Sequence, residues 1–280
     1  MVSLGVLVAA GAQDAARRAL TEEQFEARVL WRLGLPLPPV AVHGDAGLPD
    51  GGVVVSVNGE PGAVETGGLI DHLWRTVTRR GADLVDDRAT RCLLDLLHEV
   101  QPDLVQAACV RFEVGFIRRR LQAFLAEGLP ITDLRGLLEA LLLVRGLQAV
   151  PPGADEAALA LSEAGYDREL RAGMRHLISS WHARAGGLDV HLVHEGWRGA
   201  LRSPLTPADR AALQAAVAAA VGGHREAVLL TDDLTRVTLR DLLRGDWPGL
   251  TVLAFGDLAP DMHIRPQSPV EKPPPGRGSG

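Results

Sequence analysis

The spacing of apolar residues changes along this chain, and the changes divide it into three regions. In the first region, the segment Glu22–Leu33 has apolar residues at helical spacing, and the proline-rich segment after it ends that helix. Asn58-Gly59 is a hairpin signal. Three β-branched or apolar runs are typical of strands: Leu4–Ala10, Val40–His43 and Val53–Val57. We therefore expect a small unit of three strands and one helix in residues 1–66.

In the second region, residues 67–147, the pattern becomes helix after helix. Thr132 or Asp133 is the expected N-cap of one helix, and Gly128 lies in the C-cap region of the helix before it. The later helix has apolar residues at i, i+3, i+4, i+7 and i+8, namely Leu134, Leu137, Leu138, Leu141 and Leu142. The earlier helix has a similar stripe, formed by Phe116, Ile117, Leu121, Phe124 and Leu125. Two such stripes predict a helical hairpin whose apolar faces are both buried.

The third region, residues 148–265, alternates between helical and strand patterns. A linker is expected at residues 148–157, and Thr206-Pro207 is a strong helix start. The expected elements are a long helix Asp167–Arg184, helices Ala208–Val221 and Asp233–Leu243, strands Leu188–Val193, Val228–Leu230 and Thr251–Phe255, and a last edge strand Met262–Arg265. Residues 266–280 are rich in Pro and Gly, and we expect a disordered tail there. The fold class is therefore expected to be α+β with three subdomains.

The composition narrows the class of partners. Hydrophobic residues make up 46% and charged residues 23% of the chain, which is ordinary for a globular protein. The net charge is −6, and the basic cluster Arg118–Arg120 has no aromatic residues interleaved for stacking on bases, so we expect no nucleic-acid partner. The longest apolar opening, Val2–Ala12, is too short to span a bilayer. A cytoplasmic location without direct membrane insertion is expected.

A search for catalytic or metal-binding residues gives no convergent set. The chain lacks the usual phosphate-binding, dinucleotide, nucleophile-elbow and zincin motifs, and Cys92 and Cys109 fit no metal spacing. On a strand, His191 and His194 would point to opposite faces, so they are expected to be ordinary surface or edge histidines. The acidic doublets at 86–87 and 232–233 precede helices, where carboxylates act as caps. We therefore expect no cofactor, no metal and no enzyme activity.

Three separated segments resemble the cytosolic domain of the FHIPEP family, the large export-gate subunit of flagellar and injectisome type III secretion systems. The first is Leu33-Gly34-Leu35-Pro36-Leu37-Pro38-Pro39-Val40. The second runs from Arg120-Leu121-Gln122 through Glu127-Gly128-Leu129-Pro130-Ile131-Thr132-Asp133-Leu134-Arg135-Gly136-Leu137-Leu138-Glu139. The third runs from Trp247-Pro248 to Pro260-Asp261. The residues that match the family's motifs are Gly34, Pro38, Pro39, Gln122, Glu127, Gly128, Asp133, Arg135, Glu139, Pro260 and Asp261.

The resemblance implies that this chain binds secretion-apparatus components or export substrates and self-associates, with the helical region providing ring contacts. It also implies recruitment to the inner membrane by partners. The family's membrane half has no counterpart here, and only a short linker lies between Gly59 and Leu69, where family members insert a subdomain that helps to form the chaperone cleft. These departures leave a second hypothesis open, a soluble scaffold that reuses the domain in a regulatory or defence system.

Overall fold

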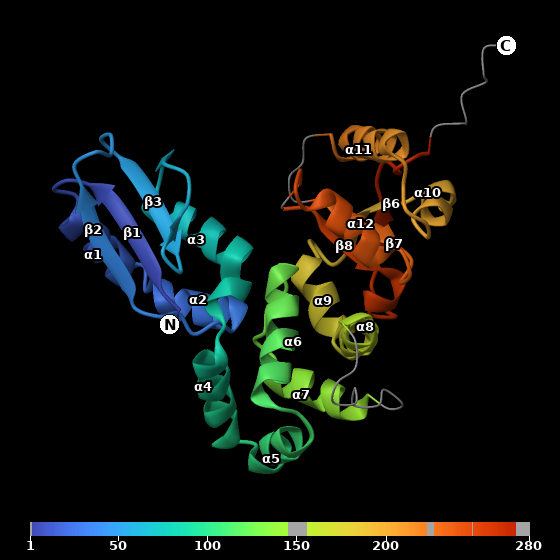
Figure 1. Cartoon of the computed structure of the whole chain (residues 1–280), viewed down its shortest axis with the longest axis horizontal. Coiled ribbons are helices and arrows are strands. Elements are labelled where there is room, and N and C mark those ends of the chain that lie inside the picture. The colour runs from blue at the N-terminus through green and yellow to red at the C-terminus, as the bar shows by residue number, and fades with distance from the viewer. Residues whose placement is uncertain (1, 145–155, 223–226, 248, 273–280) are drawn as a thin grey trace. The chain divides into compact units, whose positions relative to one another are not determined.

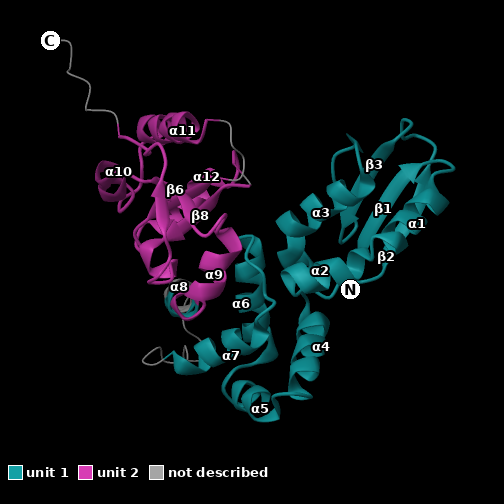
Figure 2. Cartoon of the chain, turned by 180° about the vertical axis from the view of Figure 1, so that it is seen from behind, with its two compact units in different colours: residues 1–170 teal, residues 171–280 magenta. Residues whose placement is uncertain are grey.

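The computed structural model describes residues 2–144, 156–222, 227–247 and 249–272, with the backbone alone for residues 156–164. The chain divides into two compact units, residues 1–170 and residues 171–280, which are coloured separately in Figure 2. Both units contain helices and strands, so the expected α+β class is confirmed. The predicted subdomain boundaries after residues 66 and 147 stay a prediction. The predicted linker at 148–157 lies mainly outside the described residues.

Unit 1 begins with a sheet covered by helices (Figure 1). Its elements are β1 (Leu4–Ala9), α1 (Gln13–Glu22), α2 (Phe25–Leu33), β2 (Val40–Asp45), β3 (Gly52–Val57), β4 (Glu60–Pro61) and β5 (Glu65–Thr66). The strand order is β2-β1-β3-β4, with β5 also paired to β3. In register, Val6 lies between Val42 of the parallel β2 and Val55 of the antiparallel β3, and all three are buried. The alternating apolar residues of these strands thus form the core of the sheet.

The expectation of one helix in this region is wrong, because α1 and α2 are separate helices. Gln24, which precedes α2, has a left-handed backbone with φ of 46°, and this breaks the helical path after α1. Helix α1 buries only Ala16. Because α1 has no large apolar side chains repeated along one face, hydrophobic periodicity could not predict it.

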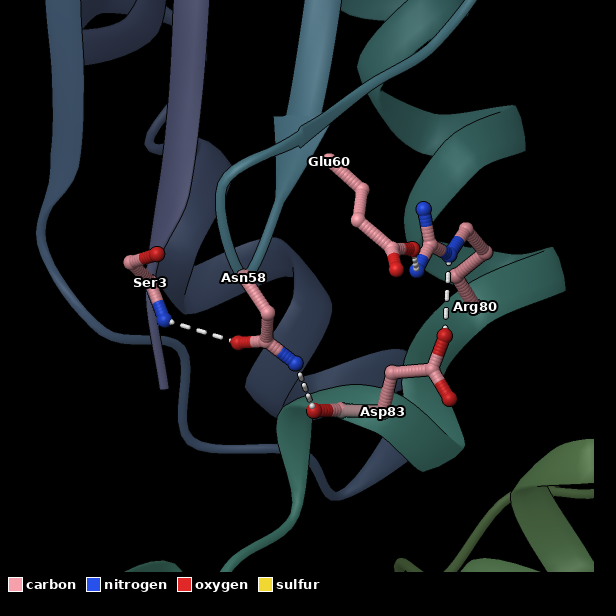
Figure 3. Close-up of polar contacts among 5 residues, drawn as sticks. All are labelled: Ser3, Asn58, Glu60, Arg80 and Asp83. Atoms are coloured by element: carbon pink, nitrogen blue, oxygen red, sulfur yellow. Dashed lines mark hydrogen bonds and ion pairs between the residues drawn. The ribbon is translucent and has the colours of Figure 1, made fainter. Parts of the chain in front are cut away.

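The β3–β4 connection is the predicted Asn58-Gly59 turn, with left-handed φ values of 54° and 82° as a type I′ hairpin requires. Figure 3 shows how Asn58 joins three segments: its side-chain oxygen accepts the backbone N–H of Ser3 at 3.1 Å, and its amide donates to the carbonyl of Asp83 at 2.9 Å. Arg80 contacts both Glu60 at 2.9 Å and Asp83 at 2.8 Å. The expected linker therefore contributes two short strands to the sheet, β4 and β5, and is joined to the helical region through Glu60.

The remainder of unit 1 is helical: α3 (Leu69–Arg80), η1 (Gly81–Leu84), α4 (Asp87–His98), α5 (Pro102–Arg111), α6 (Val114–Ala126), α7 (Leu134–Leu143) and α8 (Glu156–Gly173), whose last turn belongs to unit 2. The predicted leucine stripe of α7 faces the core, since Leu134, Leu137, Leu138 and Leu141 are all buried. Leu142 is only partly buried. The predicted buried faces of the hairpin are thus largely confirmed.

Unit 2 is a parallel sheet of order β8-β7-β6-β9 with helices around it (Figure 1). Its elements are α9 (Arg175–His182), β6 (Leu188–Leu192), α10 (Glu195–Ala200), α11 (Pro207–Val221), β7 (Val228–Thr231), α12 (Arg236–Leu243), β8 (Thr251–Ala254), η2 (Phe255–Asp257) and β9 (Ile264–Pro266). Trp197 is fully buried in the core, packed among Val193, Val217 and Leu229. The expected single helix Asp167–Arg184 is wrong, because α8 ends at Gly173 and α9 begins at Arg175.

The expected disordered tail from residue 266 is also wrong as far as residue 272, and residues 273–280 lie outside the described residues. The backbone N–H of Gln267 donates to Val190 at 2.8 Å, and that of Val270 donates to Leu192 at 2.9 Å. Val270 is fully buried in the core of unit 2, and the Trp197 indole donates to the Glu271 carbonyl at 3.0 Å. Composition alone predicted disorder because one valine among prolines carries almost no hydrophobic signal.

Candidate functional site: a junction of two sequence motifs

Two of the motif segments found in the sequence lie against each other in unit 1. The backbone N–H of Ile131 donates to the carbonyl of Leu33 at 2.8 Å, which joins the end of α2 to the α6–α7 turn. Gly34 caps α2 with φ of 74°. A Cβ added to Gly34 would lie 2.6 Å from the backbone of Ile131 and Thr132, so only glycine permits this close approach.

The residues after Gly34 continue the contact with the helical region. Leu35 is fully buried. Both its side chain and that of Leu125 lie beside Gly81, within 3.7 Å of where a Cβ on that glycine would be. Pro38 is partly buried and Pro39 is exposed. The first motif therefore connects the sheet to η1 and α6.

The α6–α7 turn is built by the second motif. The N–H of Gly128 donates to Leu125 and that of Leu129 donates to Phe124, both at 3.0 Å, and Gly128 has φ of 71°. This is a Schellman motif, with Glu127 as the C-cap. Asp133, not Thr132, then caps α7 by accepting the N–H of Gly136 at 2.9 Å. The geometry of this turn thus explains the motif residues at positions 127, 128 and 133.

Of the other motif residues, Gln122 is partly buried, whereas Arg135, Pro260 and Asp261 are exposed. Gln122 donates to the carbonyl of Val85 at 2.8 Å and so fastens α6 to the segment before α4. Arg135 and Glu139 form an exposed ion pair at 2.8 Å on α7. Pro260 and Asp261 are exposed in unit 2, so they are not part of this junction.

Sequence reasoning missed the residues that hold α8 against α6 in unit 1. Arg120 has only 2% of its surface exposed and contacts the Asp167 carboxylate at 2.6 Å. Phe112 stacks on Phe116 with ring centroids 5.0 Å apart, and Tyr166 meets Phe116 edge-on at 5.1 Å. An arginine inside the run Arg118–Arg120 resembles a solvated basic cluster in the sequence. Nothing in the pattern could have pointed to a partner 47 positions away.

The residues first considered for chemistry have structural roles. Asp86 accepts the N–H of Ala89 at 2.8 Å and caps α4, as predicted. Asp232 accepts that of Thr235 at 2.9 Å, as a cap before α12. His191 is largely buried with its Nδ1 2.8 Å from the Ser268 carbonyl, so the expectation of two surface or edge histidines is wrong for it. His194 is the N-cap of α10.

The described residues contain no cluster of three or more potential metal ligands. Across those same ranges, no helix is both long enough and apolar enough to cross a membrane. The junction is built from backbone hydrogen bonds, a helix cap and the side-chain contact of Gln122, and these can position a surface for a partner.

Comparison with known proteins decides the family. The model of the FHIPEP family matches residues 64–263. The chain belongs to the FHIPEP family. The match contains the second and third motif segments and begins after the first.

Among relatives of this FHIPEP chain, the probable translocation protein y4yR of Sinorhizobium fredii is 25% identical over an alignment of 227 residues, and the match covers 76% of this chain and 31% of that protein. The chain thus corresponds to about a third of that relative's length.

Two solved structures share the fold with a TM-score of 0.78. The nonameric EscV cytosolic domain from the type III secretion system is 15% identical and is matched over 96% of each chain. In the Chlamydia pneumoniae CdsV and CdsO protein complex, the matched chain is 13% identical, with 96% of this chain and 97% of that chain covered. At these identities the likeness is one of fold.

Proposed function

We propose that this FHIPEP-family chain is a ring-forming, partner-binding module of a type III protein export gate that acts by assembly rather than catalysis. The observation that carries the proposal is the fold shared over nearly the whole chain with a nonameric cytosolic domain. The CdsV and CdsO complex supports binding to another component of a secretion apparatus. In this proposal the chain acts on the cytosolic side, and its partners recruit it to the inner membrane.

The α6–α7 hairpin is the proposed place for ring contacts. Its inner face is buried in the core of unit 1, because Leu137, Leu138 and Leu141 have no exposed surface. Its outer face presents Arg135 and Glu139, whose side chains are 60% and 45% exposed. An exposed charged pair on a rigid, doubly capped hairpin contributes little to stability, so it is available for orienting a neighbouring subunit.

The test is the oligomeric state of the full chain. Sedimentation velocity over a concentration series, with negative-stain electron microscopy of the largest species, should reveal closed rings. Arg135→Ala should weaken the assembly while the monomer melts at the wild-type temperature. Arg244→Ala is the matched control, since Arg244 is 68% exposed and paired with Asp241 on its own helix in unit 2. A chain that stays monomeric at every concentration would contradict the ring.

One observation favours the scaffold hypothesis as a second candidate. Between Gly59 and Leu69, where the family resemblance implies an inserted chaperone-docking subdomain, the chain has only the short strands β4 and β5. A secretion assay in a strain without this gene separates the two functions. Loss of export supports the gate component, and unchanged export supports the scaffold.

A further inference from the structure

The outer face of α4 has charged side chains that form no hydrogen bond or ion pair with other described residues. One side of this helix is buried through Thr90, Leu93 and Leu94. The opposite side is a shallow surface depression lined by Arg88, Arg91, Cys92, Asp95, Leu96 and Glu99. Successive members of that set are alternately three positions and one position apart, so they form one stripe along the helix. All six are exposed, Leu96 by 53%.

The charges on this stripe are ordered against the stability of the helix itself. Arg88 is in the first turn of α4, and Glu99 is its C-cap. A helix dipole favours acidic residues at the start and basic residues at the end, the reverse of this arrangement. Arg91 and Asp95 are spaced i, i+4 in the less favourable direction. Within the part of the chain that the structure describes, no hydrogen bond or ion pair engages the side chains of Arg88, Arg91, Asp95 or Glu99. Helix stability therefore gives no reason for this order.

The order does have a reason if the stripe meets a copy of itself. We propose that α4 pairs antiparallel with α4 of a second copy of this chain. Around a two-fold axis, Arg88 would face Glu99 of the second copy and Arg91 would lie near Asp95 of the second copy, each pair occurring twice. Cys92 and Leu96 would lie at the centre as the less polar part. Antiparallel helices also place their dipoles in the favourable relative orientation.

This contact differs from the ring contact in its symmetry. A two-fold, isologous contact closes at two copies, whereas a ring requires a head-to-tail contact between different surfaces. The pairing is therefore independent of the proposed function, and it would join two chains or two rings. A contact of one helix with another buries much less than a stable dimer interface, so we expect weak association that strengthens when many copies are held together.

Cys92 makes the pairing measurable. In the proposed register, the two Cys92 Cα atoms would be about 6–7 Å apart, from a helix separation of about 8–10 Å, a Cα radius of about 2.3 Å on each helix and an axial offset of about 4.5 Å. Both cysteines of the chain, Cys92 and Cys109, are exposed. A Cys109→Ser background therefore restricts cross-linking by a short bismaleimide to Cys92. Wild-type stripes should give a covalent dimer, and Cys92→Ser should remove it.

Charge reversal tests the arrangement directly. Arg88→Glu with Arg91→Glu makes the stripe wholly acidic, and Asp95→Arg with Glu99→Arg makes it wholly basic. Each variant alone should lose Cys92 dimer by about tenfold or more, since attraction becomes repulsion at every pair. An equimolar mixture of the two should regain it as a heterodimer, identified by mass. The variant with all four substitutions, which inverts the order of charges along the stripe, should also dimerise.

Each alternative result overturns the proposal. If either single-sign variant cross-links like the wild type, the charges do not carry the contact. If the variants lose dimer but the mixture does not regain it, α4 meets a different surface of the second copy or a different protein. Circular dichroism of each variant excludes misfolding, and the reversals should leave the melting temperature unchanged or raised because they agree with the helix dipole.

Discussion

Gly34 allows a quantitative test of the motif junction through the substitution Gly34→Ala. The left-handed backbone of Gly34 costs a non-glycine residue about 1–2 kcal/mol. The added Cβ, 2.6 Å from the backbone of Ile131 and Thr132, forces the two segments apart. This strains or breaks the Ile131–Leu33 hydrogen bond, and an unpaired buried amide costs about 1–3 kcal/mol more. We expect a total loss of about 2–5 kcal/mol.

The matched control is Gly128→Ala. Gly128 has nearly the same φ, 71° against 74°, but no atom lies within 4 Å of its added Cβ. Its substitution should cost only the backbone conformation, about 1–2 kcal/mol. Urea unfolding gives both free energies, and hydrogen exchange of the Ile131 amide should accelerate in Gly34→Ala alone. Equal losses in the two variants, or an Ile131 amide that stays protected, would refute the close approach as the reason for glycine at position 34.

Three further predictions follow from buried groups, exposed groups and the hairpin after β3. Leu138→Ala should lower the free energy of unfolding in urea by about 2–5 kcal/mol because Leu138 has no exposed surface. Arg135→Ala should change that free energy by less than about 0.5 kcal/mol because its ion pair is exposed. A stable Leu138→Ala protein would place the buried face elsewhere. Burial and the positive charge of Arg171 lower the pKa of His182 from 6.5 to about 4, so stability is complete above pH 6.5 and falls by about 3 kcal/mol as the pH drops to 4. His182→Gln should flatten that pH profile, and an unchanged slope would assign it to another group. Calorimetry should detect no tight binding of a flagellar-type export chaperone, because the inserted subdomain is replaced by the hairpin at residues 58–66; a tight 1:1 complex would mean that the cleft is built in another way.

Local sequence signals predicted the features that depend on a few neighbouring residues. The Asn58-Gly59 turn needs left-handed backbone at both positions, and those residue types adopt it readily. Thr206 accepts the N–H of Asp209 at 3.1 Å, as the Thr-Pro signal indicated. Such features depend only on residues within three or four positions of one another, so the local sequence is enough to predict them.

Features that depend on distant partners could not be predicted in this way. Arg171 is buried and donates twice to the Asp257 carboxylate, at 2.9 and 2.7 Å, although the two residues are 86 positions apart. Buried arginines are rare without a partner, yet no spacing rule identifies the partner. The approach of Gly34 to Ile131 is of the same kind. Family resemblance marked both motifs, but only the structure brings them together.

The order of strands in unit 2 has a consequence for synthesis of the chain. β6 lies between β7 and β9, and Asp189 pairs in register with Arg265, 76 positions later. A nascent chain whose β6 has left the ribosome must therefore wait for residues 264–270 before the strand has both neighbours. Until then the apolar strand β6 has one edge without a hydrogen-bonded neighbour. Chaperones bind chains in this state, and aggregates form from it. All of unit 1 precedes residue 171, so the ribosome translates it in full before it begins unit 2.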